Sequence, residues 1–168
     1  MLNIFNDLSP FFEDCYRRIN VREYAKIMHI SPPTASKLLS DYHNEFFLKK
    51  EKYKNYIFYY ANKDSKQFIE FSRIYWGIKL ERLAKFANQE LINPLLILFG
   101  SLSKAEVKKD SDIDIAIFSS KKIEFDSFES KLKRNIQVFW FKSLGDIKNK
   151  ELLNNILNGY ILTGRLKW

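Results

Sequence analysis

The sequence contains little of what builds disulfide-rich, zinc-binding or membrane-spanning proteins. It has one cysteine, Cys15, and two histidines, His29 and His43. A lone cysteine excludes an internal disulfide, and so few cysteine and histidine ligands argue against a structural zinc site. No apolar run approaches the roughly 20 residues that cross a bilayer, and the opening MLNIFNDLSPFFED lacks a signal-peptide layout. These absences predict a cytoplasmic globular protein that does not enter the membrane.

The chain contains enough apolar residues to fold. Its 168 residues are 46% hydrophobic and 16% aromatic, which suits one domain or two small ones with a buried core and excludes a disordered chain. The net charge is +8, from 28 basic and 20 acidic residues, and it favours an anionic partner. Lysines outnumber arginines 21 to 7. An AT-rich coding bias would give the same excess, so the charge permits a nucleic acid without naming it.

The first 62 residues predict three short helices and a hairpin. Ser9 and Pro10 predict the start of a helix that ends near Ile19. A second helix is expected over 21–28, and Ser31 is the expected cap of a third over 32–43. The strand-like segments EFFLKK and YIFYYA follow, separated by the charged EKYKN.

This layout, carried by VREYAKIMHISPPTASKLLSDYHNEFFLKK, resembles the winged helix-turn-helix of many prokaryotic regulators. The resemblance implies double-stranded DNA as a partner. Thr34, Ser36 and Lys37 would approach base edges, while amides at the helix start and lysines meet phosphates. The hairpin lysines expected to hold phosphates are Lys49, Lys50, Lys52 and Lys54. The alternative is that these are solvated positions on a small winged helix that binds protein.

A long amphipathic helix is expected from Asp64 to about Asn88, with Gly77 as a weak point. Its apolar stripe comprises Phe68, Phe71, Ile74, Tyr75, Ile78, Arg82 and Phe86, widened by Trp76 and Leu83. Asn93-Pro94 then marks a stop before the next strand.

The segment LLILFGSLSKAEVKKDSDIDIAIF, residues 95–118, carries the candidate chemistry. An apolar strand over 95–99 ends at the turn Gly100-Ser101, whose backbone and hydroxyl suit a phosphate. In the next strand Asp112 and Asp114 share one face because successive strand side chains alternate. Adjacent carboxylates repel unless a cation joins them, and Mg²⁺ or Mn²⁺ suits such ligands. This equipment predicts nucleotidyl transfer from a nucleoside triphosphate.

Parts of this segment also have a purely structural explanation. Asp110-Ser111-Asp112 would be a solvated turn, and D-I-D-I would be an edge strand protected by its charges. Together, L-F-G-S, nine residues and S-D-I-D-I resemble the signature of the polymerase-β-like nucleotidyltransferases, and of their minimal group above all. The resemblance covers Leu95 to Trp168, with SLGDIKNKELLNNILNGYILTG as closing helices and a last strand. It implies Gly100 and Ser101 as the phosphate-binding turn, and Asp112 and Asp114 as catalytic metal ligands.

The chain departs from that family at two places. Members usually continue the turn with arginine, a small residue, arginine and glycine, whereas this chain has Leu102, Ser103, Lys104 and Ala105. Lys104 keeps a charge for the nucleotide but loses the guanidinium fork, and Lys108 or Lys109 is a possible substitute. Gln137 in NIQVFWF stands where the third carboxylate is expected, which removes a general base. Glu124 or Asp126 would replace it in another register.

The predicted fold is α/β (α+β). It has a winged helix-turn-helix over 1–62, a connecting helix over 63–90 and a nucleotidyltransferase domain with a mixed sheet over 91–168. The predicted function is metal-dependent transfer of a nucleoside monophosphate from a triphosphate to a hydroxyl acceptor, with DNA bound by the winged helix. The alternative is a degenerate transferase acting as a DNA-binding regulator, or as the antitoxin-like partner of a small helical protein.

Overall fold

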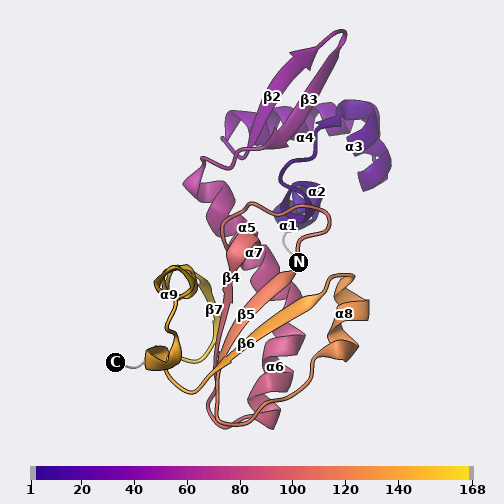
Figure 1. The fold of residues 1–168 in the computed structure, drawn as a ribbon. Helices are drawn as coiled ribbons and strands as arrows, with labels where there is room; N and C mark the ends of the chain where they lie inside the picture. Colours follow the sequence, from indigo (N-terminus) through magenta and orange to yellow (C-terminus); the bar gives the residue numbers. More distant parts are fainter. Residues whose placement is uncertain (1–2, 167–168) are drawn as a thin grey trace. The chain divides into compact units, whose positions relative to one another are not determined.

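The computed structural model describes residues 3–166, and the chain divides into two compact units. The N-terminal unit is the chain up to Ser72 together with Ala105–Lys109, and the C-terminal unit is Arg73–Lys104 and the chain from Asp110 onward. Most of their elements are labelled in Figure 1. Among the described residues, no helix is both long and apolar enough to cross a membrane.

Short helices and a small antiparallel sheet form the N-terminal unit. The sheet has the order β1-β3-β2, so the hairpin strand β3 lies in the middle. The helices predicted over 21–28 and 32–43 are confirmed, the second with one further residue. The elements are α1 Asn3–Asp7, α2 Ser9–Glu13, β1 Ile19–Asn20, α3 Val21–Met28, α4 Pro32–Asn44, β2 Leu48–Tyr53 and β3 Tyr56–Ala61.

Two predictions in this unit are wrong. The first helix ends at Glu13 instead of near Ile19, because Asp14 is extended (φ −151°) and Ile19 pairs with Tyr59 in the sheet. Ser9 does not cap that helix, since its hydroxyl donates to the Asn6 carbonyl at 2.7 Å. The hairpin is also longer than expected, because Lys49–Tyr53 pair with β3 and leave only two residues for the turn.

Aromatic side chains fill the core of the N-terminal unit. Phe11, Phe12 and Phe68 are fully buried, and the rings of Phe12 and Phe68 lie 5.1 Å apart. The Cys15 N–H donates to the Val107 carbonyl at 2.8 Å, and both side chains are buried. The segment Ala105–Lys109 is therefore part of this unit, although residues on both sides of it belong to the other.

The helix expected over 64–88 is two helices, α5 Lys66–Lys79 and α6 Glu81–Glu90. The chain bends at Leu80 (φ −91°, ψ 1°) instead of at Gly77. Gly77 stays helical, and a Cβ there would lie 2.8 Å from the ring of Tyr160, so its lack of a side chain makes room for that ring. The predicted stripe is partly wrong, because Ile74 and Ile78 are about 40% exposed.

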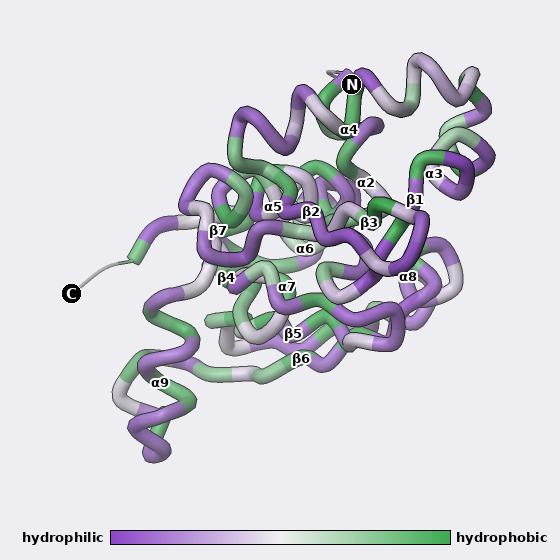
Figure 2. Tube along the Cα trace, turned by 90° about the horizontal axis from the view of Figure 1, so that it is seen from above, coloured by the Kyte–Doolittle hydropathy of each residue, from purple (hydrophilic) through white to green (hydrophobic). Residues whose placement is uncertain are grey.

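A mixed sheet, as predicted, organises the C-terminal unit, and it has four strands. Its order is β6-β5-β4-β7, with β4 antiparallel to β5 and β7, and β5 parallel to β6. One face of the sheet packs on α9. Hydrophobic and hydrophilic residues alternate along that helix (Figure 2). The remaining elements are β4 Leu95–Phe99, α7 Gly100–Ser103, β5 Ile113–Phe118, α8 Asp126–Leu132, β6 Ile136–Phe141, a 3-10 turn Leu144–Asp146, α9 Lys150–Leu157 and β7 Tyr160–Thr163.

Candidate functional site

Strand register brings the predicted site residues of the C-terminal unit together. Asp114 pairs with Phe99 at the end of β4 and with Gln137 near the start of β6. The turn Gly100–Ser103 follows β4 directly as α7 and contacts β5. Residues paired across neighbouring strands project to the same face. Asp114 therefore lies between the turn and Gln137.

The carboxylate of Asp114 lies against the turn. Gly100 has φ +70°, a conformation that favours glycine, and a Cβ added to it would collide with the Asp114 carboxylate. Asp114 is half-buried, and this burial, followed by the charge of Asp112, raises the pKa of its carboxyl group above the ordinary value. Asp112 precedes β5 by one residue and shares the face of Asp114.

The carboxylate of Asp112 is held by two side-chain amides. Gln137 Nε2 donates to Oδ2 at 2.7 Å and Asn135 Nδ2 donates to Oδ1 at 3.2 Å. The preceding residue is fixed as well, because Arg134 Nη1 donates to the Ser111 carbonyl at 2.6 Å. Arg134 is only 9% exposed and lies over the Trp76 ring, 5.2 Å from its centroid.

The residues after Gly100 differ in their exposure and their contacts. Ser101 is partly exposed, and no side chain of the described residues caps the start of α7. Leu102 is fully buried, so the residue at the place of the family's first arginine serves the core. Lys104 Nζ donates to Asn155 Oδ1 at 2.8 Å. Ala105 has φ +55° where family members have glycine.

An arginine outside the motif fixes the same turn. Arg73 Nε donates to the Ser103 carbonyl at 2.7 Å, and its Nη2 donates to the Asn158 carbonyl at 3.3 Å. Sequence reasoning missed Arg73, Arg134 and Asn135. Only the contacts reveal Arg73 and Arg134, because they lie far from the motif in sequence. Asn135 stands two residues before Gln137, and the strand alternation offered a signal for it.

The oxygen donors at this site suit a hard divalent cation. Asp112 and Asp114 supply carboxylate oxygens on one face, the ligand type that Mg²⁺ and Mn²⁺ prefer. Within residues 3–166, no group of three or more histidine, cysteine, aspartate or glutamate residues has a metal-binding arrangement. The register puts Gln137 beside Asp114, whereas Glu124 and Asp126 are exposed before and at the start of α8.

In the N-terminal unit, Thr34, Ser36 and Lys37 are all exposed on α4. The amides at the start of that helix are not free, which corrects the expectation that they meet phosphates. Pro32 and Pro33 have no N–H. The Thr34 N–H donates to Ser31 Oγ at 3.3 Å and the Ala35 N–H to the Ser31 carbonyl at 2.9 Å. An anion at this helix would therefore depend on side chains.

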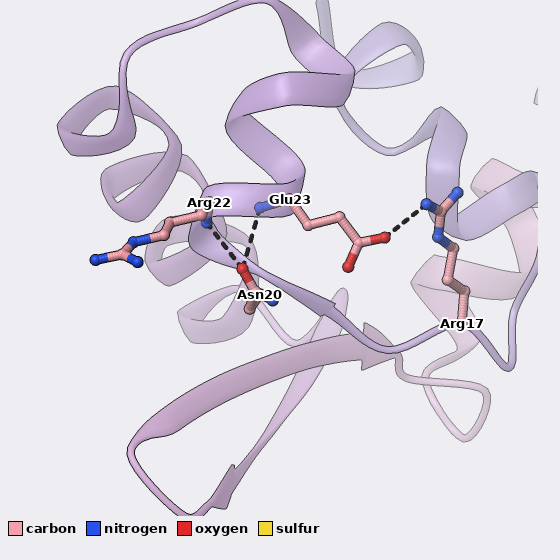
Figure 3. Close-up of polar contacts among 4 residues, drawn as sticks. All are labelled: Arg17, Asn20, Arg22 and Glu23. Atoms are coloured by element: carbon pink, nitrogen blue, oxygen red, sulfur yellow. Dashed lines mark hydrogen bonds and ion pairs between the residues drawn. The ribbon is translucent and has the colours of Figure 1, made fainter.

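The start of α3 is capped in the same way. Figure 3 shows Asn20 Oδ1 accepting the N–H groups of Arg22 and Glu23, both at 3.0 Å, while Glu23 pairs with Arg17 at 2.6 Å. The Arg22 guanidinium extends away from these contacts (Figure 3). Arg22 also lines a pocket of about 350 Å³, together with Asn20, Val21, Pro32, Asn55, Tyr56 and Ile57. The sequence analysis did not identify Arg22 as a candidate residue.

A comparison with known protein families identifies the family of the C-terminal part of the chain. The model of the family described as polymerase beta, nucleotidyltransferase, matches residues 81–165, half of the chain. The chain belongs to the polymerase beta nucleotidyltransferase family. No curated protein and no solved structure matches it.

Membership in the polymerase beta nucleotidyltransferase family supports a nucleotidyltransferase-like function for residues 81–165. A nucleoside triphosphate is the substrate that this family suggests, and its members typically use a divalent metal ion. The match begins at Glu81, the first residue of α6. The match therefore covers the segment that contains Asp112 and Asp114 and does not extend to α3, α4 or the hairpin.

Proposed function

We propose that the C-terminal unit binds a nucleoside triphosphate with Mg²⁺ or Mn²⁺ and transfers its nucleoside monophosphate to a hydroxyl acceptor. The observation that carries this proposal is the position of the Asp114 carboxylate against Gly100, with Asp112 on the same face. A turn that suits phosphate thus meets two carboxylates that suit the cation accompanying a triphosphate. Membership in the nucleotidyltransferase family supports the same reaction class.

In this proposal each residue has one task. Gly100 lets the triphosphate approach the backbone closely, and Ser101 donates its hydroxyl to a phosphate oxygen. Asp112 and Asp114 bind the cation, which would neutralise the triphosphate and stabilise the leaving pyrophosphate. Lys104 would exchange Asn155 for a phosphate oxygen.

The first test is calorimetric titration with ATP, GTP, CTP and UTP, with and without Mg²⁺. We expect Mg²⁺-dependent binding of at least one triphosphate, and its loss in Asp112→Ala with the melting temperature preserved. Asp110→Ala is the matched control, because Asp110 is an exposed carboxylate on the preceding loop. Equal binding by the Asp112→Ala protein and the wild type would refute the assigned metal site.

We further propose that the N-terminal unit is a winged helix-turn-helix that binds double-stranded DNA. Its element order from α2 to β3 supports this, as does the exposure of Thr34, Ser36 and Lys37 on α4. The capped helix starts leave phosphate binding to side chains. Arg22 and the exposed hairpin lysines Lys50, Lys52 and Lys54 are the candidates.

DNA binding can be tested by charge reversal. We expect Lys37→Glu to weaken duplex binding about tenfold or more and to reduce its dependence on salt concentration, because a phosphate contact is lost. Lys150→Glu makes the same change of net charge on α9 and is expected to bind like the wild type. Equal affinities for the Lys37→Glu and Lys150→Glu proteins would remove α4 as the recognition helix.

A second function is favoured by one observation, the amide of Gln137 beside Asp114. An amide cannot take a proton from an acceptor hydroxyl, and a missing general base costs roughly 10²–10⁴ in rate. A protein that binds a triphosphate without transferring it would act as a nucleotide-responsive DNA-binding regulator. Triphosphate binding with no labelling of any acceptor by an α-phosphate-labelled nucleotide would select this function. The small helical partner protein remains a sequence prediction, testable by co-purification.

A further inference from the structure

The two amides that hold Asp112 come from one short segment at the start of β6. Gln137 Nε2 and Asn135 Nδ2 each take one oxygen of the carboxylate, at 2.7 and 3.2 Å. The backbone joins the same two segments, because the Ile113 N–H donates to the Asn135 carbonyl at 2.9 Å. Asp112 is therefore fixed through its side chain and through the following residue.

This arrangement answers the problem posed by two neighbouring carboxylates. A carboxylate close to another is ordinarily relieved by a cation, since like charges repel. Here the amide N–H groups of Asn135 and Gln137 provide charge-assisted hydrogen bonds to both Asp112 oxygens. These hydrogen bonds stabilise the charge of Asp112 without a metal ion, so a cation arriving alone gains less than it would at an unpartnered pair.

Gln137 sets the charge of the site as well as its geometry. It pairs with Asp114 in the parallel register of β5 and β6, so a carboxylate here would be the third on one face. A third carboxylate would add repulsion and a charged oxygen ligand for a cation, whereas the amide of Gln137 adds no negative charge. Residue 137 therefore sets the negative charge that a free cation would meet at this site.

We infer that Asn135 and Gln137 are positioning residues that hold Asp112 in place of a resident metal ion, so that this site takes its divalent cation together with a triphosphate. This inference rests on the proposed triphosphate binding and adds how the cation arrives. The triphosphate supplies the missing negative charge and oxygen ligands, and the complex binds as one ligand.

The test is a Mn²⁺ titration of the whole chain, followed by water-proton relaxation, which distinguishes protein-bound Mn²⁺ from Mn²⁺ on free nucleotide. For the wild type we expect weak binding of Mn²⁺ alone, and affinity at least about tenfold higher with a non-hydrolysable triphosphate analogue. For Gln137→Glu we expect Mn²⁺ alone to bind at least about tenfold more tightly than to the wild type, because a third carboxylate is added.

Gln89→Glu is the matched control, because it makes the same chemical change on the exposed face of α6 and is expected to bind Mn²⁺ like the wild type. A variant that merely damages the fold cannot bind the ion more tightly, so the gain reports on the site. Tight binding of Mn²⁺ alone to the wild type would overturn the inference and leave triphosphate binding intact. Absence of any complex with the analogue would overturn the proposed function, and the inference with it.

Discussion

The helix starts beside the two candidate sites, α3 and α4 in one unit and α7 in the other, differ in what happens to their backbone N–H groups. In the N-terminal unit, Asn20 and Ser31 occupy these groups at the starts of α3 and α4. In the C-terminal unit, no side chain of the described residues caps α7 after Gly100. Capping stabilises a helix and removes donors from any ligand. Under the two proposals above, a DNA phosphate would meet side chains in the first unit, and a nucleotide phosphate would meet backbone N–H groups in the second.

The unfolding of each unit can be followed with a different side chain, a cysteine in one and tryptophans in the other. Cys15 is the only cysteine, and it lies in the N-terminal unit, where burial raises the pKa of its thiol to about 12. It will react with thiol reagents only when that unit opens. Trp76 and Trp140 lie in the C-terminal unit, so tryptophan fluorescence follows that unit. Each variant below can thus be assigned to the unit it affects.

The largest expected effect comes from adding a side chain at Gly100, in the turn whose backbone N–H groups no side chain of the described residues caps. In Gly100→Ala, the new Cβ would collide with the Asp114 carboxylate at a positive φ. We expect loss of triphosphate binding and a decrease of roughly 2–4 kcal/mol in the unfolding free energy, from backbone strain and overpacking together. Urea denaturation followed by tryptophan fluorescence measures it.

Gly145→Ala is the control for that substitution, because the nearest atom to its added Cβ is Ser143 Oγ, at an ordinary 3.6 Å. It is expected to change the unfolding free energy by less than about 0.5 kcal/mol. If Gly100→Ala were as mild as Gly145→Ala, the close contact between the turn and Asp114 would be refuted.

An intermediate effect is expected from removing the cap of α4. Ser31→Ala leaves the Thr34 N–H without its side-chain acceptor and should cost about 1 kcal/mol. The measurement is the rate of Cys15 labelling in mild urea, which should rise about fivefold for that loss. Ser36→Ala, an exposed change within the same helix, should leave the rate near that of the wild type. Equal rates for both variants would show that capping does not stabilise this unit.

The smallest effect concerns the charge held at the site. The pKa of Asp114 is raised by burial and by Asp112, so its charged form destabilises the folded state at pH values above that pKa. Asp114→Asn should therefore increase the unfolding free energy at neutral pH by about 0.5 kcal/mol, as replacements at strained sites do. The gain should shrink as the pH falls through the titration of Asp114, because the wild-type carboxyl group is then neutral too. A gain that is independent of pH would contradict this origin.

Local signals predicted much of the fold. The strand over 95–99 and the helix over 21–28 begin and end where the sequence pattern predicts them. The predictions failed where contacts with residues distant in sequence determine the local structure. Ile19 leaves the expected helix because Tyr59 offers a strand partner, and the stripe through Ile74 and Ile78 is not the buried one. A periodic pattern identifies a face without saying which neighbour covers it.

The sequence by itself determined the Gly-Ser turn and the shared face of Asp112 and Asp114, because these follow from glycine's freedom at positive φ and from strand alternation. The mixed sheet was expected only from the resemblance to the polymerase-β-like nucleotidyltransferases that the motif carries. Only the tertiary structure decided that Gln137, and not Glu124 or Asp126, lies beside Asp114, that Asn135 joins it on Asp112, and that Arg73 and Arg134 hold the surrounding backbone. The physical reason is that register and long-range hydrogen bonds depend on how separate segments pair. No single segment contains that information.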